Sequence, residues 1–117
     1  MIALIDDDGS FRNALYESLS SLGYGVHAFE SANDFVASAK NPSYDCIISD
    51  VHMPGMSGIE LTKLLGARGS RVPVILVTGR TEPGLEVQAA AGGALCLLRK
   101  PFDTQALMVR LRQAMGD

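Results

Sequence analysis

Five short apolar runs, spaced along the whole chain, constrain the fold more than any other feature. They are Ile2–Ile5, Gly25–Phe29, Cys46–Ser49, Val74–Val77 and Leu95–Leu98. Each has the length of a strand, and most are apolar throughout, which is typical of strands buried on both faces of a parallel sheet. Because segments with helical spacing separate the runs, we predict an α/β fold in which five β–α units form one doubly wound sheet.

The segments between the runs carry the signals of helices. The first helix is predicted from apolar residues that would share one face: Phe11, Ala14, Leu15, Leu19 and Leu22. Gly23 would follow its last turn. The other four helices are predicted from capping or first-turn residues, which are Ser31, Ser57, Pro83 and Asp103. The fourth, from Glu82 to Ala91, has the weakest apolar face.

The chain has the size and composition of one globular domain. It contains 117 residues, of which 47% are hydrophobic and 20% charged. Its net charge of −3 argues against nucleic-acid binding by this domain. We find neither an apolar run of membrane-spanning length nor the basic start of a signal peptide, so we expect a cytosolic protein without membrane contact. In that compartment Cys46 and Cys96 are expected to be buried free thiols rather than a disulfide.

Chemically active side chains follow four of the five runs. In chain order they are Asp6, Asp7 and Asp8, then Asp50, then Thr78, then Lys100. In doubly wound sheets ligands bind outside the carboxyl ends of the strands, so we expect these side chains to converge. Several carboxylates suit Mg²⁺, and an aspartate beside that ion can attack a phosphoryl group as a nucleophile. A lysine and a hydroxyl would then stabilise the charge of the transferring group.

The order of the motifs that contain these residues resembles the receiver domains of two-component response regulators. The motifs are Ile5-Asp6-Asp7-Asp8, Asp50 to Gly58, Val77-Thr78-Gly79, Gly93-Ala94 and Lys100-Pro101-Phe102. The resemblance covers Ile2 to about Met115, and the stretch from Asp50 to Glu60 is similar to the nitrogen-fixation regulator subgroup. It implies one receiver domain over residues 1–117, with a flavodoxin-like sheet of strand order 2-1-3-4-5.

The resemblance also implies a role for each matching residue. Asp50 would be the phosphoacceptor, Lys100 would pair with the phosphoryl oxygens, and Thr78 would swing inward to hydrogen-bond the phosphoryl group. Mg²⁺ would be bound by Asp7, by Asp6 directly or through water, by Asp50, and by the main-chain carbonyl of His52. The peptide bond between Lys100 and Pro101 is expected to be cis.

The implied partner is a sensor histidine kinase or a histidine phosphotransfer protein, which would supply the phosphoryl group. The face made by the fourth helix, fifth strand and fifth helix would then bind a target or form a homodimer. Such a domain is a switch that catalyses only its own phosphorylation and dephosphorylation. Met1 fits a natural N-terminus, and the chain would be a stand-alone regulator or the receiver part of a transcriptional regulator.

Further positions bear on signal output and on the access of water to the site. Many receivers carry a tyrosine or phenylalanine three residues before the lysine, where this chain has Leu97. Our hypothesis is that signalling depends instead on the loop after Thr78 and on the fourth helix. The side chains of His52 and Arg80 occupy positions that, in the family, tune the access of water to the phosphoryl group. For His52 we favour this role, with a simply exposed side chain as the alternative.

Two other functions compete with this interpretation. Asp6 to Ser10 fits the Asp-x-Asp-Gly-(Ser/Thr) loop of haloacid-dehalogenase-like phosphatases, in which Asp6 and Asp8 would act. Against this interpretation, that family needs an acidic pair after the lysine. The phosphatase interpretation also leaves the Asp50 to Gly58 stretch unexplained. We therefore interpret Asp8 as a helix cap. A receiver that has lost phosphorylation and only binds partners is the third possibility, but none of the expected active residues is missing.

Overall fold

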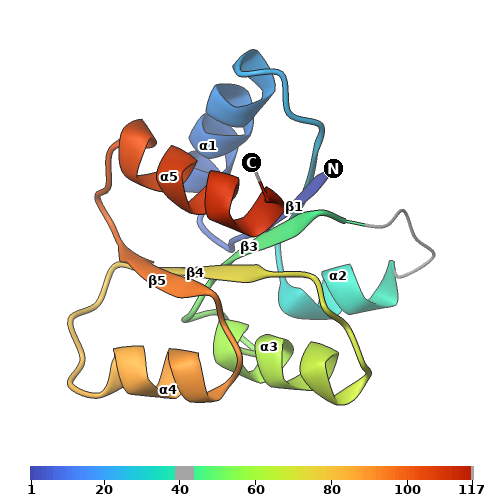
Figure 1. Ribbon diagram of the computed structural model, residues 1–117, viewed down its shortest axis with the longest axis vertical. Helices are drawn as coiled ribbons and strands as arrows, with labels where there is room; N and C mark the ends of the chain where they lie inside the picture. Colours follow the sequence, from blue (N-terminus) through green and yellow to red (C-terminus); the bar gives the residue numbers. More distant parts are fainter. Residues whose placement is uncertain (39–43, 117) are drawn as a thin grey trace.

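The computed structural model describes residues 1–38 and 44–116. A parallel sheet in the order β2-β1-β3-β4-β5 forms its centre (Figure 1). The strands are β1 (Ile2–Ile5), β2 (Val26–Phe29), β3 (Cys46–Asp50), β4 (Val74–Thr78) and β5 (Cys96–Arg99). The α/β class, the parallel sheet and the strand order 2-1-3-4-5 are therefore confirmed.

Helices cover both faces of this sheet and make a three-layer molecule. They are α1 (Gly9–Ser21), α2 (Ala32–Ala37), α3 (Gly58–Ala67), α4 (Leu85–Ala91) and α5 (Thr104–Met115). Helices α1 and α5 pack on one face, and α2, α3 and α4 on the other (Figure 1). Each face has its own apolar core, one that includes Ile48 and Leu107 and the other that includes Leu61 and Leu76. The described helices are all too short to cross a membrane.

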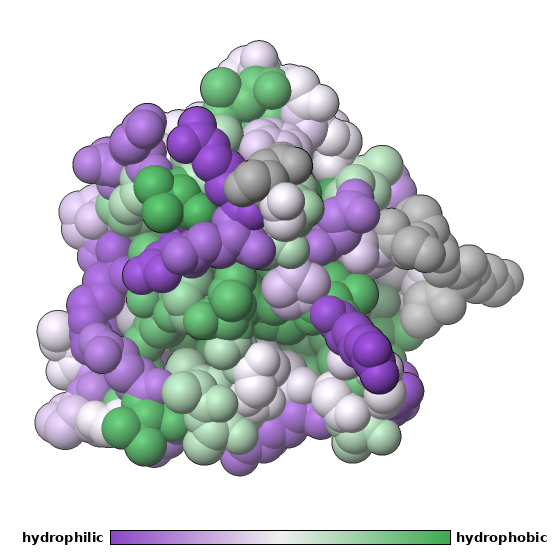
Figure 2. All heavy atoms as spheres, viewed as in Figure 1, coloured by the Kyte–Doolittle hydropathy of each residue, from purple (hydrophilic) through white to green (hydrophobic). Residues whose placement is uncertain are grey.

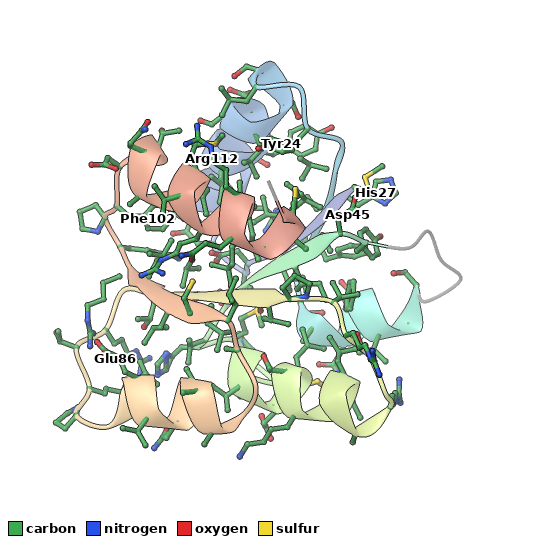
Figure 3. All side chains as sticks on the ribbon, in the orientation of Figure 1. Tyr24, His27, Asp45, Glu86, Phe102 and Arg112 are labelled. Carbon is green, nitrogen blue, oxygen red and sulfur yellow. The ribbon has the colours of Figure 1, made fainter. Side chains whose placement is uncertain are left out.

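The burial of the strands follows their position in the sheet. All residues of β1, β3 and β4 are buried, as their continuous apolar sequences predict. The edge strand β5 is half-buried throughout, and β2 exposes His27 and Ala28 (Figure 3 labels His27). The register pairs Asp50 with Val77 and Thr78 with Arg99, so the carboxyl ends of the central strands lie level. This alignment brings the residues after each strand to one edge of the sheet.

Side-chain caps define most helix starts at the predicted residues. Asp8, Ser31 and Asp103 each accept a hydrogen bond from a backbone N–H of the following turn. Ser57 and Glu60 form the predicted capping box of α3. Gly23, beyond the end of α1, has φ of 97°, a conformation that suits the residue after a helix.

The fourth helix is shorter than predicted. We expected it to begin at Glu82 with Pro83 in its first turn, but α4 begins at Leu85 and Pro83 lies in the preceding turn. The reason is Gly84, whose φ of 80° is left-handed and cannot continue a right-handed helix. Leu95 precedes β5 instead of opening it, and it is 43% exposed.

Some apolar positions are more exposed than expected. Ala14 is exposed and Leu22 is 49% exposed, because Leu22 lies beyond the last residue of α1. Both cysteines are free, as predicted, but only Cys46 is buried, whereas Cys96 on the edge strand is half-buried. Burial raises the pKa of the Cys46 thiol to about 12. This thiol is therefore protonated and unreactive at neutral pH.

Candidate functional site

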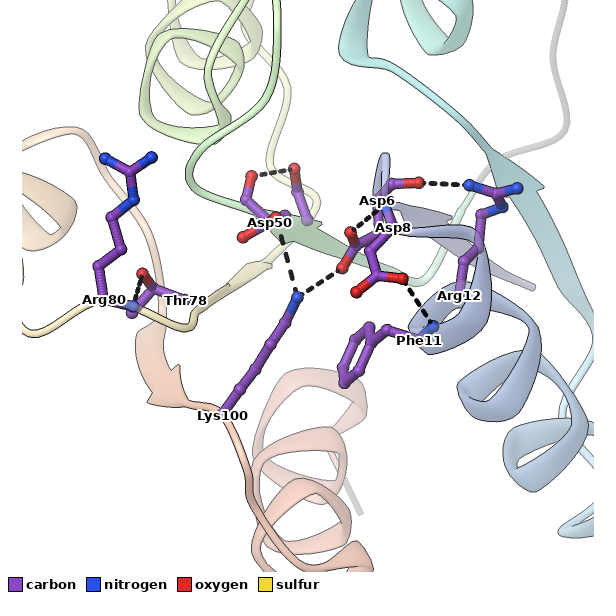
Figure 4. Close-up of polar contacts among 9 residues, drawn as sticks. Asp6, Asp8, Phe11, Arg12, Asp50, Thr78, Arg80 and Lys100 are labelled. Atoms are coloured by element: carbon purple, nitrogen blue, oxygen red, sulfur yellow. Dashed lines mark hydrogen bonds and ion pairs between the residues drawn. The ribbon is translucent and has the colours of Figure 1, made fainter.

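Three carboxylates meet at the carboxyl ends of β1 and β3 (Figure 4 shows two of them). Oxygen atoms of Asp6, Asp7 and Asp50 lie within 4.8 Å of one another. Asp6 is fully buried, Asp50 is 8% exposed, and Asp7 is exposed. Hard oxygens at this spacing could hold a cation such as Mg²⁺, and the exposed Asp7 leaves one side of the group open to solvent.

Lys100 reaches the same acids from the end of β5. Its Nζ lies 3.0 Å from Asp6 Oδ2 and 3.8 Å from Asp50 Oδ2 (Figure 4). Its backbone N–H donates to the Thr78 carbonyl at 2.7 Å, and the Lys100–Pro101 peptide is cis as predicted. One ammonium faces three carboxylates, so the group retains a net negative charge that favours a further cation.

The loop after β1 is fixed by its own hydrogen bonds. Asp6 Oδ1 accepts from the Asp8 N–H at 2.9 Å, and Asp8 Oδ1 accepts from the Phe11 N–H at 3.2 Å. Arg12 Nη1 donates to the Asp6 carbonyl at 2.7 Å. Asp8 thus caps α1, as predicted, and it lies outside the carboxylate group. This position argues against the phosphatase alternative, in which Asp6 and Asp8 would act together.

Asp50 has an elevated pKa. Burial is the main cause, and the negative charge of Asp6 adds to it, while Lys100 and the backbone N–H of His52 act in the opposite direction. The balance raises the pKa of Asp50 from 3.8 to about 6.

The Asp50 main chain also lies against α3, where a β-carbon at Gly58 would collide with the Asp50 carbonyl. Only glycine fits this contact.

Residues from the loop after β4 form the outer part of the site. Thr78 is fully buried, and its Oγ1 accepts from the Arg80 N–H at 3.0 Å (Figure 4). Within residues 1–38 and 44–116, no hydrogen bond joins Thr78 to Asp50. His52 Nε2 and Arg80 Nη1 lie 3.1 and 3.4 Å from Glu82 Oε1. The His52 side chain is therefore held by a carboxylate rather than simply exposed.

Two further contacts were not predicted from the sequence. Arg99 donates to the Arg80 carbonyl at 2.8 Å and pairs with Glu86 Oε1 at 3.2 Å, which ties β5 to the loop after β4 and to α4 (Figure 3 labels Glu86). The ring of Phe11 lies under the Lys100 ammonium. Both contacts join elements that are distant in sequence. The sequence signals for them were a basic residue beside Lys100, which is Arg99, and an aromatic residue after the acidic run, which is Phe11.

Comparison with known proteins identifies related chains. Residues 2–112 match the profile of the response regulator receiver domain. The transcriptional regulatory protein FixJ of Bradyrhizobium diazoefficiens is 39% identical over 97% of this chain and 56% of its own length. The C4-dicarboxylate transport transcriptional regulatory protein DctD of Pseudomonas aeruginosa is 37% identical over 97% of this chain and 25% of its own length. A crystal structure of FixJ-N superposes with a TM-score of 0.89 at 28% identity, covering 98% and 92% of the two chains. The chain thus spans about half of one relative and a quarter of the other.

Proposed function

Because the chain belongs to the response regulator receiver domain family, we propose that Asp50 accepts a phosphoryl group from a sensor histidine kinase or a histidine phosphotransfer protein. The observation that carries this proposal is the convergence of Asp50 with Asp6, Asp7 and Lys100 at one edge of the sheet. We further propose that residues 1–117 work as one receiver domain.

Mg²⁺ fits the chemistry of the donor set. The carboxylates of Asp6, Asp7 and Asp50 would hold it, together with the main-chain carbonyl of His52. The geometry supports this assignment, because three carboxylates converge where Lys100 supplies one ammonium. When bound, the ion supplies positive charge beside the reacting oxygens.

In the proposed transfer, a carboxylate oxygen of Asp50 attacks phosphorus and the bond from phosphorus to the donor imidazole nitrogen breaks. The electron pair of that bond stays with the imidazole. Lys100, already 3.8 Å from Asp50, would pair with a phosphoryl oxygen. The Thr78 hydroxyl would turn toward another oxygen and lose its bond from the Arg80 N–H. Hydrolysis would reset the switch, with His52 and Arg80 at the mouth tuning the access of water.

The proposed route of the signal is the loop after Thr78. Rotation of Thr78 would disturb Arg80, whose carbonyl is bound by Arg99, which in turn pairs with Glu86 of α4. These contacts support a route through the loop and α4, since the half-buried Leu97 packs against the core and has no hydroxyl to report the state of Thr78.

The output surface would be the face formed by α4, β5 and α5. Apolar side chains gather there in a band over β5 (Figure 2), and its large exposed residues are Val87, Leu95 and Val109. A cavity of about 350 Å³ between α4 and β5 hollows this face. We propose that it binds a second copy of the chain after phosphorylation, since identical apolar bands can cover each other.

The relatives named as transcriptional regulators suggest what such a switch controls. We propose that this domain regulates transcription through a further domain, and that its acidic surface takes no direct part in DNA binding. Free thiols at Cys46 and Cys96 fit action in the reducing cytosol.

The test is phosphorylation by acetyl phosphate with Mg²⁺, followed by intact mass measurement. The wild type should gain the mass of one phosphoryl group, and Asp50→Asn should gain none. Full labelling of Asp50→Asn would overturn the assignment. Turnover of p-nitrophenyl phosphate that survives Asp50→Asn but not Asp6→Asn would favour the phosphatase instead.

A further inference from the structure

Lys100 has a neighbour in addition to the two acids. The Phe11 ring lies beneath its ammonium, with 3.9 Å between Nζ and the ring centroid (Figure 4). At this distance the electron-rich face of a phenyl ring attracts a cation. Phe11 was expected only to contribute to the apolar face of the first helix. In fact the ring lies at the edge of the candidate site, where it is half-buried.

The ring is held firmly in this position. Phe11 lies in the first turn of α1, where its N–H donates to the Asp8 cap at 3.2 Å. The ring of Phe102 meets it edge-on, with centroids 6.0 Å apart and planes at 80° (Figure 3 labels Phe102). Phe102 follows Lys100 by two residues, so the segment that carries the lysine packs around the ring on two sides.

The contact directs the ammonium without neutralising it. A lysine side chain ends in three N–H donors on a flexible four-carbon stem. Here one donor is used by Asp6 Oδ2 at 3.0 Å, the ring takes a second direction, and Asp50 Oδ2 lies 3.8 Å away. An uncharged ring neutralises none of the ammonium's positive charge, whereas another carboxylate in its place would compete with a phosphoryl group for that charge.

We propose that Phe11 is a positioning residue for phosphoryl transfer, whose ring holds the Lys100 ammonium on the side that faces Asp50. The proposal rests on the proposed function of Asp50 and Lys100 and adds to it a residue outside the family motifs. Removal of the ring would free the lysine stem and lower the fraction of molecules in which the ammonium is in place.

The first experiment compares phosphorylation rates with acetyl phosphate at saturating Mg²⁺. Phe11→Leu should reduce the rate at saturating acetyl phosphate about threefold to thirtyfold, the range that a cation–π contact spans. The half-saturating concentration of the donor should change less. Phe11→Tyr keeps a ring in place and should restore the rate to within about twofold of the wild type. The matched control is Phe29→Leu, which breaks another edge-on ring pair, with Phe35, in the core on the other face of the sheet. The substitution keeps the Phe29 carbonyl that accepts from the Asp6 N–H, so it changes ring packing alone.

The second experiment is a double-mutant cycle with Lys100→Met. If the ring acts through the lysine, Phe11→Leu should have no further effect on the rate once Lys100 is replaced. Equal losses with and without Lys100, or equal losses in Phe11→Leu and Phe29→Leu, would overturn the proposal.

A measurement without phosphoryl chemistry separates the ring–ammonium contact from the proposed role of Asp50. The ring current of Phe11 should shift the ε-methylene protons of Lys100 upfield in the NMR spectrum of the wild type and of Phe11→Tyr, but not in Phe11→Leu. An unshifted wild-type signal would refute the contact itself. A shifted signal in a protein that acetyl phosphate never labels at Asp50 would refute the proposed function, and the positioning role with it.

Discussion

The two halves of the site differ in how they are held. Around Asp6, Asp50 and Lys100 the charged groups are largely buried and lie on the ends of packed strands. In the loop after β4 and the first turn of α4, the Arg80–Glu82 and Arg99–Glu86 pairs are solvent-exposed. Buried charge interactions are strong and costly to break, whereas exposed pairs contribute little. The difference suggests that the chemical half is rigid, and that the output half can rearrange at low cost.

The largest expected effect comes from removing the one ammonium that the described residues 1–38 and 44–116 place beside the buried acids. Lys100→Met leaves Asp6 buried beside two other carboxylates, and we expect it to lower the free energy of unfolding by about 3 kcal/mol without divalent cations. Urea denaturation measures this value. Added Mg²⁺ should recover part of the loss, since it binds the folded acids. A change below about 0.5 kcal/mol would show that the acids do not need the lysine.

Replacing the proposed phosphoacceptor should instead raise the free energy of unfolding. The folded state raises the pKa of Asp50 from 3.8 to about 6, so it binds a proton more tightly than the unfolded chain does. Stability should therefore fall as the pH rises from about 4 to about 6 and stay lower above that range. Asp50→Asn should remove this decline and stabilise the protein at pH 7 by about 2 to 3 kcal/mol without Mg²⁺. Thermal or urea unfolding across this pH range measures the effect. If Asp50→Asn showed no gain in stability, the elevated pKa would be contradicted.

The contact between Asp50 and α3 offers a test with an internal control. Gly58→Ala places a methyl group against the Asp50 carbonyl and should cost about 1 to 3 kcal/mol. Gly66→Ala, in the same helix, meets open space and should stabilise by about 0.5 to 1 kcal/mol. Urea denaturation measures both changes in the free energy of unfolding. Similar values for the two variants would show that this side of the site is not closely packed.

The smallest change in stability should come from the exposed half. Arg99→Ala removes the contacts to the Arg80 carbonyl and to Glu86, and the free energy of unfolding should change by less than about 1 kcal/mol. Its effect should instead be visible in NMR shifts of α4 and in the response of that helix to fluoroberyllate. If stability fell by several kcal/mol, the proposed contrast between the two halves would be wrong.

The sequence predicted the chemical half better than the output half. Asp6, Asp7, Asp50 and Lys100 were found together because parallel strands end at the same edge, so the residue after each apolar run has a defined place. The predicted start of α4 was wrong, because Gly84 adopts a left-handed conformation that the composition of this segment does not reveal. The Phe11 and Arg99 contacts depend on long side chains meeting across the fold, which no local pattern encodes.

The most direct test of the central claim is to locate the phosphoryl group by chemical trapping. Borohydride reduces an aspartyl phosphate to homoserine, which peptide mass mapping then identifies by position. After acetyl phosphate and Mg²⁺, we expect homoserine at position 50 and nowhere else. Homoserine at position 6 or 8, or an unmodified Asp50 in a protein that takes up phosphate, would contradict the account.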